Sequence, residues 1–290
     1  MSTQPPARPR PQRGVAVLAA LAFLWLAGTL WSAHRSIEAT TGVVALAVSA
    51  YALPGLVGAA LVAGLGAGLL TLRRVDPALT RPVGFRFVAA LGAGLAVALA
   101  AGGAFAAVAG GDPQRLILAA TLAGAAILGG ALAANRAPHT QAGVVAAALA
   151  MFVTGLALAL ARGPVFDWLY EPSAADRVDA ETWYAILTAL IGGVAAGVVA
   201  YRALRRRRSR WLAYLVAGAG PGALLLIGEV IIRIGGSSLL YLTRQISDAD
   251  RTMQQWTDGS RINHAMVVMF LGGIVALVGY GRSLGPGQRS

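Results

Sequence analysis

The sequence predicts an all-α polytopic membrane protein, built as one bundle of about eight transmembrane helices with both termini in the cytoplasm. Of its 290 residues, 57% are hydrophobic and only 12% are charged, whereas a soluble domain carries about 25% charged residues. The hydrophobic residues gather in runs of about 20, the length that an α-helix needs to cross a bilayer. Arginine is unevenly distributed between the segments that separate these runs, and this distribution predicts their orientation.

The chain begins with a polar segment, 1–13, that is rich in proline and arginine, so we expect a disordered cytoplasmic tail. The apolar run 14–33 is longer than the 7–15 residues of a signal-peptide core, and Trp31 stands where a cleavage site needs a small residue. We therefore expect an uncleaved first span. Length and helix breakers place the eight spans at about 14–33, 43–70, 84–109, 115–134, 142–161, 183–203, 211–233 and 262–281.

The eight spans form a single transmembrane domain, 14–281, which a cytoplasmic tail follows at 282–290. Two connections on the predicted outer side are longer than the others, 162–182 and 234–261. They hold most of the acidic residues and several aromatic residues, which favour the membrane–water interface. Any chemistry in a loop is expected on this side, because the inner connections are short and basic.

Arginine supplies every basic residue of the chain, and most arginines fall on the side that holds the N-terminus. The densest run, Arg205–Arg210, lies there, while Asp76 is the only acid on that side. The positive-inside rule then places both termini in the cytoplasm, and the composition suggests a bacterial inner membrane. We expect Arg205–Arg210 to bind anionic lipids and not nucleic acid, because the arginines sort by membrane side.

Two absences exclude whole classes of chemistry. The chain has no cysteine, which removes disulfides, thiolate nucleophiles and sulfur-bound metal sites. It also has no lysine, which removes Schiff bases and a Walker-type phosphate loop.

Glycine is abundant, and pairs four residues apart predict close helix packing within the chain, with dimerisation as the alternative. These pairs are Gly64 and Gly68, Gly193 and Gly197, and Gly218 and Gly222.

Glu229 and Arg233 are an acid–base pair inside the apolar run that begins at Trp211, and their i, i+4 spacing places them on one helix face. Depth decides their role, because a charge at the bilayer centre costs roughly 2.5–3.5 kcal/mol. Counted from Trp211, Glu229 lies about 27 Å along the helix, near the surface of a hydrocarbon layer about 30 Å thick, which favours a structural pair. A helix that breaks at Gly220–Pro221–Gly222 and then spans 222–242 would bury Glu229 deeply, which favours a functional site.

Other polar residues are weaker candidates for a site. Asp248 and Asp250 form an Asp-Ala-Asp string that resembles the acidic pair with which some membrane glycosyltransferases hold a metal-bound phosphate, although the resemblance covers three residues only. His34, Glu38 and His264 fall at outer helix ends, where imidazole can ligate a metal or haem. A polar helix edge explains the same residues, so no metal or cofactor is predicted.

Polar groups inside the spans are few, the main ones being Ser49, Tyr51, Thr121, Thr154 and Thr188. A pathway for a polar solute needs more of them near the midplane. The sequence therefore favours a non-catalytic envelope protein, either an accessory or scaffold subunit or a handler of lipid-like molecules, with a membrane-protein partner or as a homo-oligomer. Two alternatives stay open: a small-solute transporter that uses Glu229 and Arg233, and a membrane enzyme that acts on a lipid-linked substrate at the outer face through Asp248, Asp250 or Glu229.

Overall fold

The computed structural model describes residues 13–40, 42–75, 82–108, 113–169, 174–207, 209–237 and 248–284, and these residues form helices with short turns at their ends. In chain order, the elements are α1 (Arg13–Glu38), α2 (Gly42–Arg74), α3 (Val83–Val108), α4 (Pro113–Ala133), α5 (Pro138–Leu169), α6 (Ala174–Leu204), the 3₁₀ turn η1 (Arg205–Arg207), α7 (Trp211–Gly235) and α9 (Asp248–Ser283). Within these described ranges, eight helices are long and apolar enough to cross a membrane. The predicted all-α class is confirmed, and these helices support a multi-pass membrane protein.

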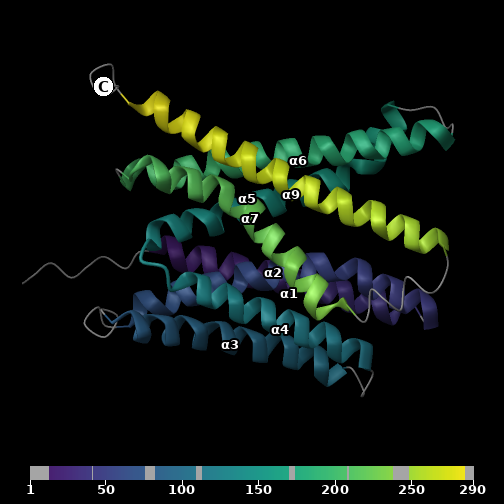
Figure 1. The fold of residues 1–290 in the computed structure, drawn as a ribbon, viewed down its shortest axis with the longest axis horizontal. Helices are drawn as coiled ribbons and strands as arrows, with labels where there is room; N and C mark the ends of the chain where they lie inside the picture. The colour runs from purple at the N-terminus through teal and green to yellow at the C-terminus, as the bar shows by residue number, and fades with distance from the viewer. Residues whose placement is uncertain are drawn as a thin grey trace, which may run out of the picture.

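The helices form two groups that α7 connects (Figure 1). One group is α1 to α4, in which α2 packs against the other three; the second is α5, α6 and α9, in which α6 packs against both neighbours. α7 runs obliquely from the second group to the first. Its first half lies beside α5, its second half reaches α2 and α4, and it packs against α9. The second half of α7 therefore lies against helices of both groups, and α2 and α4 are distant from it in sequence.

Glycine allows the closest helix contacts. Gly218 on α7 and Gly272 on α9 face each other so tightly that a Cβ on either would collide with the other's carbonyl oxygen. One turn further, Gly222 meets the backbone of Met269 in the same way, and in the first group Gly64 of α2 lies against the carbonyl of Ala126 on α4. The glycine spacing thus serves packing within the chain, as predicted.

α7 is one continuous helix, and Pro221 lies inside it. Proline has no N–H to donate to the carbonyl of Ala217 four residues earlier, which weakens the helix there, and Figure 1 shows α7 turning in its middle part. The helix continues to Gly235, where the N–H of Gly236 donates to the carbonyl oxygen of Ile232 at 2.8 Å. The alternative of a break at Gly220–Pro221–Gly222 with a new span to residue 242 is therefore wrong.

Helix extends further into the two long connections than hydropathy predicts. α5 continues to Leu169 and α6 begins at Ala174, so most of 162–182 is helical. α9 begins at Asp248, which makes the second half of 234–261 part of the same helix as the last span. Polar residues such as those of 248–260 form helix readily when a packed apolar segment continues the helix, and the hydropathy of a span does not detect them.

The two ends of the bundle differ in charge. The arginine-rich end, defined by Arg73, His139 and Arg207, also holds the start of α1, because Gly14 lines the same cavity as these three residues. The acidic end, defined by Glu38, Glu181 and Glu229, lies where α1 and α7 finish and α6 begins. The C-terminal end of α9 lies away from the acidic end (Figure 1).

Candidate functional site

Glu229 is the only charged residue among the buried side chains that the structure describes, with 8% of its surface exposed. It lies on the half of α7 that crosses towards α2. Gly228, next to it, lies against Val57 of α2, where a Cβ would come within 3.5 Å of the valine side chain. A carboxylate in such surroundings needs hydrogen bonds or counter-charges to offset its lost hydration.

Two arginines supply that compensation, one for each carboxylate oxygen. Arg233 Nε lies 3.2 Å from Glu229 Oε1, and Arg261 Nε lies 3.2 Å from Glu229 Oε2. Both arginines donate a hydrogen bond to the acid. We call these three residues the Glu229 clamp. Because Arg261 comes from α9, the clamp ties α7 to α9 in addition to bracing α7 itself.

The Arg233 partner follows from the i, i+4 spacing in the sequence, whereas Arg261 was missed. It stands 32 residues from Glu229 and falls in what reads as an outer loop, one residue before the last predicted span. Its position at the start of the last predicted span could have indicated this role, because an arginine at the boundary of a neighbouring span can reach a buried acid near the same membrane surface. Hydropathy alone does not say that α7 and α9 are neighbours.

A cavity of about 210 Å³ opens beside the Glu229 clamp. Its polar wall is formed by Glu229, Ser260, Arg261 and His264, and its apolar wall by residues of α2 and α7 such as Ile232. Pro54 and Gly58 of α2 also line it, and these are positions where little side chain fills the space. The cavity is therefore bounded by three helices and has charge on one side only.

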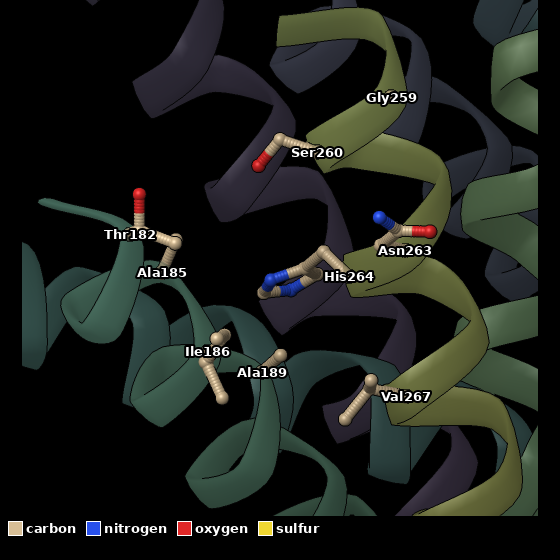
Figure 2. A pocket seen from close by; sticks show the side chains of 9 residues that line it. All are labelled: Thr182, Ala185, Ile186, Ala189, Gly259, Ser260, Asn263, His264 and Val267. Atoms are coloured by element: carbon tan, nitrogen blue, oxygen red, sulfur yellow. The ribbon is translucent and has the colours of Figure 1, made fainter. Parts of the chain in front are cut away.

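A second cavity, of about 340 Å³, lies between α6 and α9 and shares Ser260 and His264 with the first. Figure 2 shows the His264 ring pointing from α9 towards α6. Polar residues line one end of this cavity and apolar residues the other. The polar residues are Thr182, Ser260, Asn263 and His264, and the apolar residues include Ala185, Ile186, Ala189 and Val267. Along both helices the polar group lies nearer the acidic end.

The three residues considered as weak candidates for metal ligands lie in two separate places. His34 Nε2 lies 3.3 Å from Glu38 Oε2 on α1, and His34 faces a cavity of about 320 Å³ bounded by α1, α3 and α4, together with Arg115. His264 instead lines the cavities around α9. In the part of the chain that the structure describes, no three His, Cys, Asp or Glu side chains come together as a metal would require.

Asp248 and Asp250 begin α9, but their side chains lie outside the described residues. The Arg205–Arg210 run divides: Arg205, Arg206 and Arg207 form η1, and of these only Arg207 lines a described cavity. The arrangement at the acidic end combines a neutralised, buried carboxylate with two adjoining cavities of mixed polarity.

Neither a family model, nor a curated protein, nor a solved structure matches the chain.

Proposed function

We propose that this protein is a non-catalytic protein of a bacterial inner membrane that holds a lipid-like amphiphile in the cavity between α6 and α9. In this proposal both termini lie in the cytoplasm, so that the acidic end of the bundle lies at the outer surface. The positive-inside distribution of arginine supports that orientation. The amphiphile then lies in the outer half of the membrane.

The observation that carries this proposal is the polarity of the α6–α9 cavity along its length. Thr182, Ser260 and Asn263 line the end of the cavity nearer the acidic end of the bundle, and Ala189 and Val267 line the end nearer the middle of the helices. In the proposed orientation, the polar end would face the membrane surface. An amphiphile in a membrane has the same order, with its polar group at the surface and its chain inside. The volume of about 340 Å³ lies in the range of small-ligand sites, roughly 300–1,000 Å³.

The Glu229 clamp supports a structural role for its charges rather than transport. Each carboxylate oxygen already accepts a hydrogen bond from an arginine, so the negative charge of Glu229 is compensated within the protein and does not require a cationic solute. The clamp would hold α7 and α9 in place and so preserve the shape of the cavities on both sides of Ser260 and His264. A transporter that uses Glu229 and Arg233 remains the alternative.

The test fills the cavity and measures bound lipid. Ala185 is half-buried and lines the α6–α9 cavity, whereas Leu187, two residues on, is exposed and does not. The full-length protein is purified in mild detergent and its co-purified amphiphiles are identified by native mass spectrometry. We expect Ala185→Phe to lose a bound species that the wild type and the control Leu187→Phe both retain. Retention of the same species by Ala185→Phe refutes the proposal.

The transporter alternative predicts a different result from a second variant. Glu229→Gln in proteoliposomes would abolish uptake of a solute while leaving the bound amphiphile in place. The amphiphile proposal instead predicts that Glu229→Gln weakens both the fold and amphiphile retention, because the clamp positions α9.

A further inference from the structure

A cavity of about 420 Å³ lies at the arginine-rich end, opposite the Glu229 clamp. Arg73 at the end of α2, His139 at the start of α5 and Arg207 of η1 all line it. These residues come from three elements far apart in sequence, so the fold, and not a local run, gathers the positive charge. None of the described residues that line the cavity is acidic.

The acid that the sequence places on this side, Asp76, lies outside the described residues. Arg73 also interacts with another group. Arg207 supplies a second positive charge to the same cavity. If the charge of Asp76 is subtracted from that of one arginine, the positive charge of the other arginine is left. His139 can donate a hydrogen bond whether or not it is charged. The cavity therefore favours an anion.

Two helices also begin at this cavity. Gly14 is the second residue of α1 and His139 the second residue of α5, and both line the cavity wall. The first N–H groups of a helix have no partner within it, and the helix dipole adds partial positive charge at that end. Side-chain charge and backbone donors thus converge on one space, an arrangement that suits phosphate.

The wall of this cavity is partly apolar. Val15, Leu18 and Ala142 line it beside the basic residues. A phosphate group held by Arg73 and Arg207 would have aliphatic side chains directly beside it. The phosphate of a lipid headgroup has a similar environment, because the apolar acyl chains of the lipid begin next to it. Basic pockets between helices at the cytoplasmic surface are suited to such headgroups.

We propose that this cavity binds a phosphate group between Arg73, His139 and Arg207, carried by an anionic lipid or by a soluble phosphate. Of the three arginines that form η1, only Arg207 takes part, because Arg205 and Arg206 do not line the cavity. The run thus combines one ligand-binding arginine with neighbours that act through general charge. This site is independent of the amphiphile site at the acidic end, since it shares no residue with it.

The test separates a specific site from diffuse attraction by using charge-matched variants. Arg206→Gln and Arg207→Gln each remove one charge from exposed positions of the same short turn. The full-length protein in neutral detergent is titrated with phosphatidylglycerol, phosphatidylcholine and inorganic phosphate. Bound lipid is measured by native mass spectrometry and the unfolding temperature by fluorescence. A charge-neutral variant, Ala142→Leu, fills the cavity and leaves every arginine in place.

We expect phosphatidylglycerol to bind and to raise the unfolding temperature of the wild type and of Arg206→Gln. Arg207→Gln should bind it about tenfold more weakly, the loss of one charged hydrogen bond, and Ala142→Leu should also bind it more weakly. The same pattern with inorganic phosphate, and none with phosphatidylglycerol, identifies a soluble phosphate as the ligand. Equal weakening in Arg206→Gln and Arg207→Gln, or wild-type binding by Arg207→Gln, overturns the proposal.

Discussion

Glu229 of α7 and Arg261 of α9 form an ion pair in which Arg261 Nε lies 3.2 Å from Glu229 Oε2. The acid is buried, and Arg261 is largely covered, with 25% of its side chain exposed. Arg233, the other partner of the acid, is about half exposed at 53%. The Glu229–Arg261 ion pair is therefore better shielded from water than the Glu229–Arg233 pair. It is also the pair that joins α7 to α9, because the Glu229–Arg233 pair lies within α7.

Removal of the acid is expected to destabilise the protein more than removal of either arginine. Glu229→Gln leaves two arginines facing a neutral side chain, and we expect a loss of roughly 1–3 kcal/mol in the free energy of unfolding, the range for an unpaired buried polar group. Unfolding in mixed micelles of dodecyl sulfate and mild detergent measures it. A variant as stable as the wild type would show that the clamp makes no net contribution.

The two arginines are expected to differ in importance. Arg233→Gln should cost less than about 1 kcal/mol, as is usual for an exposed pair, and Arg261→Gln should cost more. In a double-mutant cycle, Glu229→Gln combined with Arg261→Gln should cost less than the sum of the two single changes. Strict additivity in the same unfolding assay would mean that the two side chains do not interact in solution.

A methyl-bearing side chain at Gly218 is expected to separate α7 from α9. Gly218→Val places its side chain against the carbonyl of Gly272, and overpacking of this kind costs about 1–3 kcal/mol or more. Gly155 on α5 is the matched control, because nothing lies within 4 Å of the position of its Cβ. Gly155→Val should leave the unfolding transition nearly unchanged. Equal effects of the two variants would contradict the packing described for α7 and α9.

An exposed ion pair provides a contrast within the same molecule. Arg162 Nη2 lies 2.7 Å from Glu181 Oε1 between α5 and α6, with about half of each side chain exposed. Despite its shorter distance, we expect Glu181→Gln to cost at most about 1 kcal/mol, because water screens the pair. A loss as large as that of Glu229→Gln would show that burial does not govern these pairs.

The orientation of the bundle is open to a direct test. The arginine distribution predicts that the C-terminus lies in the cytoplasm. A fluorescent protein fused after Ser290 should therefore be bright, and alkaline phosphatase fused at the same place should be inactive. The opposite pair of results would reverse the proposed orientation and move the phosphate cavity to the outer surface.

The number of long helices could be predicted from the sequence because the length of each apolar run sets it, as in 14–33 and 211–233. The ends of the helices could not, since the polar residues from Asp248 to Gly259 continue α9 without raising its hydropathy. Continuity of α7 through Pro221 was one of two open alternatives, because proline in a helix can cause a bend or a break.

One of the two ion pairs of the Glu229 clamp was predictable from sequence. Arg233 follows from helical spacing, which is a local property, whereas Arg261 depends on which helices are neighbours. The cavities depend on neighbours in the same way: Arg73, His139 and Arg207 share no local pattern, and only the packing of α2, α5 and η1 brings them together.

The chain order of α7 and α9 also fixes the order in which the parts of the Glu229 clamp are made. α7 is made before α9, so of the two arginines of the Glu229 clamp only Arg233 is present when α7 has just been synthesised. Its second counter-charge, and the tight seat of Gly218 and Gly222, arrive with Arg261 and the rest of α9. Until α9 packs against α7, Glu229 lacks its second counter-charge and the glycine face of α7 lacks its partner helix. Because α9 supplies both Arg261 and the surface that covers Gly218 and Gly222, a chain that ended before α9 would leave Glu229 with one counter-charge and the glycine face of α7 uncovered.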